Sequence, residues 1–228
     1  MEIYHVLNRG VDKRIIFFDE KDYLRFIHDL YEFNDEEPAM NTNYFFNKFK
    51  NMDLRSQYIA NQRRKNRKMI VKIFAFCLMP NHYHLMLSPI VKDGITKFMR
   101  KLNIGYAKYF NEKYGRVGTL FERRYKAIPI TKESHFIYLP TYIHLNPLDL
   151  KFPEWRNKEI RNYKEAMKFL ESYRWSSFLD YIGKKNFPSI TQREFLNKIW
   201  GGPKEIRKNI LRWLKEMDFE EMKEITLE

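Results

Sequence analysis

Hydrophobic and polar residues alternate with two different periods along the chain, and each period predicts one kind of secondary structure. A period of two, or a short apolar run rich in β-branched and aromatic residues, predicts strands. Four segments have this character: residues 2–8, 73–79, 82–87 and 120–130. Between the second and the third, Pro80-Asn81 predicts a tight turn and therefore a hairpin. In the fourth, Pro129 predicts an end at a sheet edge.

A period of three to four residues predicts amphipathic helices. Three segments have it: residues 20–33, 95–114 and 133–146. Asp19 is expected to cap the first helix, and Gly115 is expected to end the second. Pro147 closes the third helix, and Pro140 within it predicts either a kink or a separate short helix that starts there.

The order of these segments is β-α-β-β-α-β-α, and its first six elements predict the fold. They are the elements of a ferredoxin-like α+β sandwich, βαββαβ, with the central hairpin in mid-sheet and helices on one face. The seventh element is an added helix that can lie across the open face. We expect residues 1–150 to form this domain, with an insertion at 34–69. Residues 151–228 are expected to form a helical C-terminal extension, and Trp155 is expected to pack back onto the sandwich.

Finer elements are expected within the insertion and the extension: short helices near residues 44–49, 191–199 and 203–217.

Composition narrows the function classes. Lys and Arg total 42 against 29 Asp and Glu, which gives a formal charge of +13, and 17% of the residues are aromatic. This balance predicts a polyanionic partner, nucleic acid first and an anionic membrane surface a distant second. No stretch has the length and apolarity of a membrane span, and no signal peptide is predicted. The single cysteine, Cys77, excludes a disulfide framework within the chain and predicts a reducing cytoplasm.

Two histidines in the third predicted strand, residues 82–87, are the first candidate functional residues. His82 and His84 are two residues apart, a spacing that sends both side chains of a strand to one face of the sheet. Two neutral imidazoles that converge from a rigid strand form half of a divalent-metal site. The alternative is that both are core histidines bonded to backbone carbonyls.

A phenol and an amide in the third helix carry the second candidate chemistry. Tyr142 and Asn146 are four residues apart and therefore share one helix face. The phenol can act as a nucleophile, and the amide carbonyl can act as a neutral oxygen ligand. Tyr142 is one of 15 tyrosines, so a packing role is the alternative, and Tyr138 and Tyr106 are the next candidates for a nucleophile.

Five motifs in one order carry a family resemblance. In chain order they are YHVLNRG, PNHYH, GYAKYFNEKYGRVGTLFERRYKA, YIHLNP and YRWSSFLDYIG. Together they resemble the HUH single-tyrosine transposases, and within these the branch of REP-associated tyrosine transposases. The resemblance covers residues 2–185, whereas residues 186–228 contain no motif of the family. Pro140 and the long insertion at 34–69 depart from the family pattern.

The resemblance implies a metal-dependent single-stranded DNA endonuclease and strand-transferase with a ferredoxin-like fold. It implies that His82 and His84 hold Mg²⁺ or Mn²⁺ and that Tyr142 is the nucleophile. Asn146 stands where many relatives carry glutamine as a third metal ligand. The implied substrate is single-stranded DNA beside a hairpin of the REP type, cleaved through a 5′-phosphotyrosine link. The implied setting is the cytoplasm, in association with the nucleoid, as a monomer or a homodimer without a membrane partner.

Basic residues are expected to hold the DNA backbone. The candidates are Arg9, Arg63, Arg64, Arg100, Lys101, Lys108, Arg123, Arg124 and Lys126. The basic run that contains Arg63 and Arg64 could also be a solvated loop. Two other functions stay open: a domesticated DNA- or RNA-hairpin binding protein that no longer cuts, and a metal phosphodiesterase that uses water as its nucleophile.

Overall fold

A four-stranded antiparallel sheet divides the molecule. The computed structural model describes residues 1–38 and 67–216. The strands are β1 (Tyr4–Arg9), β2 (Val71–Met79), β3 (His82–Pro89) and β4 (Lys126–Pro129), and their order in the sheet is β2-β3-β1-β4. Every neighbouring pair is antiparallel. This is the strand order of a ferredoxin-like βαββαβ sandwich, so the predicted fold class is confirmed.

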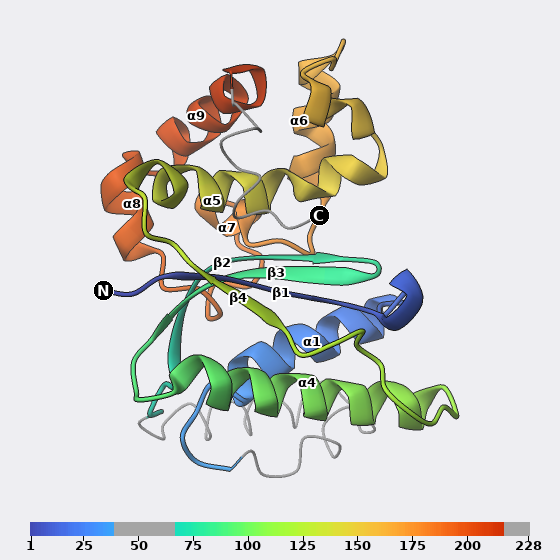
Figure 1. The fold of residues 1–228 in the computed structure, drawn as a ribbon. Helices are drawn as coiled ribbons and strands as arrows, with labels where there is room; N and C mark the ends of the chain where they lie inside the picture. The colour runs from blue at the N-terminus through green and yellow to red at the C-terminus, as the bar shows by residue number, and fades with distance from the viewer. Residues whose placement is uncertain (39–66, 217–228) are drawn as a thin grey trace, which may run out of the picture.

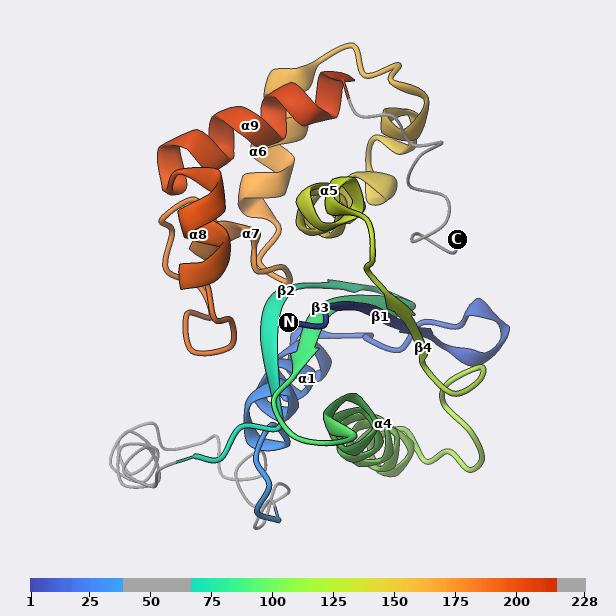
Figure 2. The same cartoon turned by 60° about the vertical axis from the view of Figure 1, so that its left-hand side comes forward.

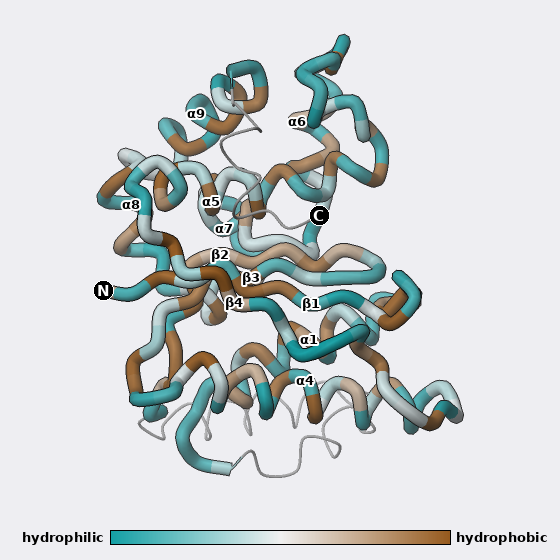
Figure 3. Tube along the Cα trace, in the orientation of Figure 1, coloured by the Kyte–Doolittle hydropathy of each residue, from teal (hydrophilic) through white to brown (hydrophobic). Residues whose placement is uncertain are grey.

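Two helices cover one face of the sheet, α1 (Glu20–Glu32) and α4 (Gly94–Lys113) (Figure 1). Asp19 caps α1 as predicted: its side chain accepts from the Asp22 backbone, and the Asp22 side chain accepts from the Asp19 backbone. The apolar stripes of both helices bury a common core against the sheet. Figure 3 shows brown, hydrophobic positions along the strands and brown positions interspersed with teal ones along α4.

The other face is covered by α5 (Glu133–Leu145) and the chain that follows it, as Figure 2 shows. The following elements are η2 (Asn146–Leu150), η3 (Pro153–Asn157), α6 (Tyr163–Ser172), α7 (Phe178–Tyr181), α8 (Glu194–Trp200) and α9 (Pro203–Glu216). They share one core with α5 and the sheet, and Trp155 is buried in it as expected. The α5 helix continues through Pro140, so the alternative of a separate helix is wrong.

The C-terminal segment also completes the sheet at its β2 edge. The Leu78 N–H donates to the Trp175 carbonyl at 2.9 Å, and the Ser177 N–H donates to the Phe76 carbonyl at 3.0 Å. The Ser177 hydroxyl is 2.8 Å from Nε2 of His144, which is buried in α5. The motif YRWSSFLDYIG therefore seals the sheet edge and ties α5 to β2.

The predicted fourth strand is wrong over its first half. Residues 120–125 form no strand beyond an isolated bridge between Gly10 and Phe121, and regular pairing begins at Lys126. The reason is visible in the burial pattern: Leu120 and Phe121 are both buried, and the next three residues are all exposed. Such a pattern does not alternate, so the segment cannot present one face to a sheet.

The start of the insertion is fixed by Asn34. Its buried side chain accepts from the N–H groups of Ile70 and Val71 and donates to the Val71 carbonyl at 2.9 Å. The segment after α1 is thereby pinned to the start of β2, so an insertion there leaves the sheet order intact. Residues 39–66, with the helix expected near 44–49, lie outside the described residues.

No helix in the described ranges has the length and apolarity needed to cross a membrane.

Candidate metal and nucleophile site

The two histidines of the hairpin point from β3 toward the layer that contains α5. His84 lies opposite Cys77 of β2 and Leu7 of β1, and it is fully buried. His82 lies next to it near the hairpin turn and is partly exposed. The ring centroids are 4.9 Å apart, and the ring planes are nearly perpendicular at 85°. The strand spacing therefore brings two imidazoles together at one end of the sheet.

Tyr142 of α5 lies directly above this pair. Its ring centroid is 5.8 Å from that of His84, with the planes at 89°. Asn146 follows one turn later and is fully buried, and its amide group donates to the Tyr142 carbonyl at 2.9 Å. The Asn146 Oδ1 atom has no hydrogen-bond partner among the described residues. The structure thus places the His84 ring between those of His82 and Tyr142, and it ties the Asn146 amide to the Tyr142 backbone one helical turn away.

A third histidine, His5 of β1, belongs to the same cluster. Its Nε2 is 2.9 Å from Nδ1 of His84, and the two rings stack with centroids 5.1 Å apart. On the other histidine of the pair, Nδ1 of His82 lies 2.6 Å from Oδ1 of Asn81. Both Nδ1 atoms are therefore engaged, which orients each ring so that Nε2 is the nitrogen offered to a metal. Sequence reasoning missed His5, although β1 lies beside β3 in the predicted fold.

These residues fit a divalent ion that also binds substrate oxygens. The fit rests on the two oriented imidazoles, and the candidate third ligand is the buried Oδ1 of Asn146, which has no donor among the residues that the structure describes. Within the described part of the chain, no three His, Cys, Asp or Glu residues are grouped so that they could hold a metal. A set of two nitrogens and one amide oxygen leaves several positions open and favours Mn²⁺ over Mg²⁺, which prefers oxygen.

A guanidinium group lies beside the candidate nucleophile. The Arg156 carbon Cζ is 5.6 Å from the centroid of the Tyr142 ring. Asp149 holds the guanidinium with two hydrogen bonds, from Nε to Oδ1 at 2.9 Å and from Nη2 to Oδ2 at 2.6 Å. The guanidinium thus lies over the Tyr142 ring as one half of an ion pair with Asp149 and helps to hold the ring in place. Arg156 comes from η3, beyond the motif YIHLNP, and sequence reasoning did not select it.

The other tyrosines considered as nucleophiles are placed differently. Tyr106 lies in the opposite layer, and its hydroxyl donates to the Ile16 carbonyl at 2.5 Å. Burial raises the pKa of Tyr106 well above its ordinary value. Tyr142 is equally buried, so the two differ in their layer and not in their exposure. Tyr138 is in α5, but its ring packs edge-on against Trp213 with centroids 6.2 Å apart. Tyr142 is the candidate that faces the histidines.

The basic residues proposed to hold DNA fall into three groups. Arg123, Arg124 and Lys126 are exposed on the segment that leads into β4, at an edge of the sheet. Arg9 lies opposite His82 in the register and forms an ion pair of 3.1 Å with Glu122. The third group lies on α4 and consists of Arg100, Lys101 and Lys108.

Residues Arg100 and Lys108 are exposed on α4, which is separated from Tyr142 by the sheet. Lys101 is largely committed to the protein itself: its ammonium group binds the carbonyls of Asp35 and Glu37, the latter at 3.0 Å. Desolvation lowers the pKa of Lys101. Lys101 therefore helps to fix the chain after α1, and its expected contact with DNA stays a prediction. Arg63 and Arg64 lie outside the described residues.

Comparisons with known proteins agree with the resemblance seen in the sequence. Residues 40–146 match the family model described as "Transposase IS200 like", a range that includes His82, His84, Tyr142 and Asn146. A solved structure described as "Structure of the REP associates tyrosine transposase bound to a REP hairpin" has 12% identity and a TM-score of 0.45, and the match covers 85% of this chain and 88% of that chain. No curated protein matches the chain.

Proposed function

The chain is similar to the IS200-like transposases over residues 40–146, and from this premise we propose that it cuts and rejoins single-stranded DNA beside a hairpin. In this proposal Tyr142 is the nucleophile, and His82, His84 and Asn146 hold Mg²⁺ or Mn²⁺. The observation that carries it is the position of the Tyr142 ring, 5.8 Å from the ring of His84. This position supports the proposal because it sets a phenol from α5 beside an imidazole from β3 that is a candidate metal ligand.

The reaction divides into two transesterifications. The Tyr142 phenol oxygen attacks a backbone phosphorus, an O–P bond forms, and the bond to the 3′ oxygen breaks. The proton lost by the phenol is matched by the proton gained by the departing 3′ oxygen, so the products are a 5′-phosphotyrosine link and a free 3′-OH. When bound, the divalent ion withdraws charge from the non-bridging oxygens and holds the phosphate in line. A second 3′-OH then attacks the link and restores the phenol.

This chain's own residues prepare the first step. His5 contacts Nδ1 of His84, and Asn81 contacts Nδ1 of His82, so each imidazole is held in a fixed orientation. Arg156 supplies positive charge beside the phenol, and Asp149 keeps the guanidinium in place. The hydrogen bond from Asn146 to the Tyr142 carbonyl fixes the end of α5, so phenol and amide keep a constant separation.

The test is covalent capture. Wild-type protein incubated with a labelled hairpin oligonucleotide and Mn²⁺ is expected to give a shifted band on a denaturing gel. Tyr142→Phe is expected to abolish this band while it still binds the oligonucleotide. Tyr138→Phe, the same change on the same helix, serves as the control and keeps the band. Adduct at the wild-type level in Tyr142→Phe refutes the assignment.

A second candidate function has one observation in its favour. Tyr142 is fully buried, whereas a nucleophile has to meet its substrate. A hairpin-binding protein that no longer cuts would need no access to this phenol. Tight hairpin binding that is insensitive to EDTA, together with no adduct in Mn²⁺, would favour this function over cleavage.

A further inference from the structure

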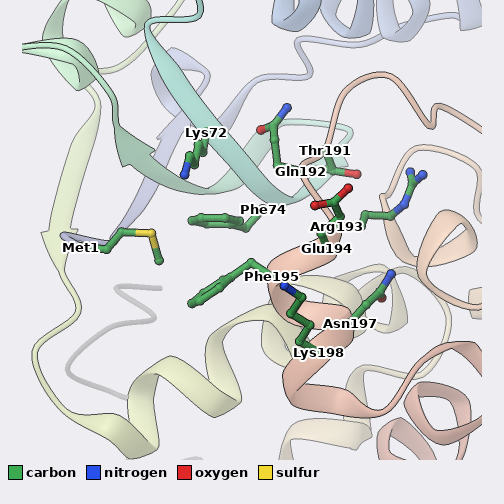
Figure 4. Close-up of a pocket in the computed structure, with 10 residues that line it drawn as sticks. All are labelled: Met1, Lys72, Phe74, Thr191, Gln192, Arg193, Glu194, Phe195, Asn197 and Lys198. Carbon is green, nitrogen blue, oxygen red and sulfur yellow. The ribbon is translucent and has the colours of Figure 1, made fainter.

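A second candidate binding site lies beyond the nucleophile, between the start of β2 and α8 (Figure 4). It is a hollow of about 630 Å³, within the range of about 300–1,000 Å³ that is usual for small-ligand sites. Phe195 in its wall packs against Phe136 of α5 with ring centroids 5.6 Å apart. Phe136 precedes Tyr142 by six residues, which corresponds to about 9 Å along the helix.

The wall of the hollow is held by the sheet. The Gln192 N–H donates to the Ile73 carbonyl at 2.9 Å, and the Ile73 N–H donates to the Gln192 side chain at 2.6 Å. The register of β2 shifts between Ile73 and Ala75, so Phe74 sits at an irregularity of the strand. Strand irregularities of this kind are common beside functional sites because they re-aim a side chain. The Phe74 and Phe195 rings are 5.3 Å apart and line the hollow together.

Two buried polar atoms in this wall lack a hydrogen-bond partner within the described ranges. They are the hydroxyl oxygen of Thr191, a residue only 7% exposed, and Oδ1 of Asn197. A buried polar atom left unsatisfied costs about 1–3 kcal/mol, so such atoms usually have a partner. Both residues line the hollow, so a rotation of either side chain to another rotamer would turn its polar atom toward a ligand there. A hydroxyl and an amide can together bind the edge of a heterocyclic base.

Two ammonium groups stand at the rim. Lys72 and Lys198 are exposed, and neither forms an ion pair with any residue that the structure describes. Arg193 is different because it donates to the Pro188 carbonyl and lies 3.8 Å from Asp180. The free cations of the hollow therefore flank an aromatic and hydrogen-bonding interior. A ligand with an anionic backbone and a flat, polar-edged ring fits this arrangement.

We propose that this hollow binds one unpaired nucleotide of the DNA strand. The base stacks on Phe195 and bonds Thr191 and Asn197, and the adjoining phosphates lie against Lys72 and Lys198. This proposal rests on the proposed function for the identity of the ligand as DNA. It adds a second attachment point for the strand, close enough to Tyr142 for a short single-stranded flank to reach both. The flank would then be read by the hollow and not by the metal site.

The test measures affinity by fluorescence anisotropy in the Tyr142→Phe background, where cleavage cannot interfere. A hairpin with single-stranded flanks is compared with the same hairpin without them. Thr191→Val, which removes only the hydroxyl, and the double change Lys72→Gln/Lys198→Gln are each expected to weaken binding of the flanked hairpin about 5-fold or more. Binding of the bare hairpin stays unchanged. Lys164→Gln, an exposed lysine of α6 that belongs to neither proposed contact surface, is the matched control and alters neither.

Abasic substitution along the flanks then locates the nucleotide. One position is expected to weaken wild-type binding and to have little further effect in Thr191→Val, because both changes remove the same contact. Equal loss for both hairpins, or no loss in either variant, overturns the proposal. Failure of the proposed function is a separate result, since it appears as no adduct in protein whose Tyr142 is intact. Binding by the hollow is measured without that step.

Discussion

The orientation of His84 by His5 can be tested by removing the hydrogen bond and keeping the ring. His5→Phe preserves the stacking on His84, where the centroids are 5.1 Å apart, and deletes the 2.9 Å contact to Nδ1. Loss of a residue that orients a metal ligand usually weakens metal affinity about 10- to 100-fold. We therefore expect the Mn²⁺ concentration that gives half-maximal adduct formation to rise by that factor.

The loss of Mn²⁺ affinity can also be measured without an assay of adduct formation. Mn²⁺ at about 100 times the wild-type Kd raises the free energy of unfolding by about 2.7 kcal/mol, because the ion binds only the folded state. After a 10- to 100-fold loss of affinity, the same concentration stabilises His5→Phe by only about 0.4–1.4 kcal/mol. Urea unfolding with and without Mn²⁺ gives both values. Each protein is its own reference, so a general destabilisation by the substitution cancels.

The control is the same substitution in the other layer. His28 lies on α1, across the sheet from the candidate metal site, with its side chain 25% exposed. His28→Phe is expected to keep the full gain from Mn²⁺. If His5→Phe also keeps the full gain and needs no more Mn²⁺ for adduct formation, the orienting role of His5 is refuted.

Three further predictions concern stability and the nucleophile. Asp22→Asn is expected to lower the free energy of unfolding by about 2–3 kcal/mol, because the buried carboxylate accepts hydrogen bonds from several donors. Urea unfolding measures this, and Asp12→Asn is the control because the Asp12 side chain is 85% exposed. Burial lowers the pKa of His144 to about 3, so below about pH 6.5 the unfolded chain takes up a proton that the folded chain does not. The free energy of unfolding is therefore expected to fall as the pH drops from about 6.5 toward 3, by up to about 1.4 kcal/mol per pH unit, and urea unfolding at a series of pH values measures this. Arg156→Met is expected to slow adduct formation about 10-fold, because it removes the guanidinium that lies over the Tyr142 ring and helps to hold it in place; adduct formation at the wild-type rate contradicts this.

Local patterns predicted the fold because each element carries its own signals. The alternation of β1, the apolar run of β2 and the turn at Pro80-Asn81 predict a hairpin beside a further strand, and the Asp19 cap marks the start of α1. The segment 120–125 was not predictable in the same way. Its apolar residues are adjacent and not alternate, so composition indicated a strand where the chain only crosses the end of β1.

The candidate site was predictable only where its residues are close in sequence. The spacing of His82 and His84, and that of Tyr142 and Asn146, follows from strand and helix geometry. His5 is 79 residues from His84, and only the pairing of β1 with β3 brings them together. Arg156 likewise reaches Tyr142 through the turn that η2 and η3 make after α5.

Charge alone could not distinguish a phosphate ligand from a structural cation. Lys101 and Lys113 belong to the same basic helix as Arg100, yet the first binds backbone carbonyls and the second binds Asp19 and Asp22. Both contacts depend on the neighbouring α1 helix, which the spacing of basic residues along α4 does not reveal. The number of cations free to hold DNA is therefore smaller than the composition suggests.

The sheet edges constrain the path of the DNA. Residues 175–177 and Gln192 pair with β2, whereas β4 has no strand on its outer side within the described residues. The cations before and within β4 lie at this open edge, between the α4 layer and the α5 layer. If the proposed DNA contacts both the outer side of α4 and Tyr142, this edge offers a path lined with cations, over Arg123, Arg124 and Lys126. If the hairpin instead stays on one layer, substitutions in α4 and at Tyr142 will not affect the same DNA contacts.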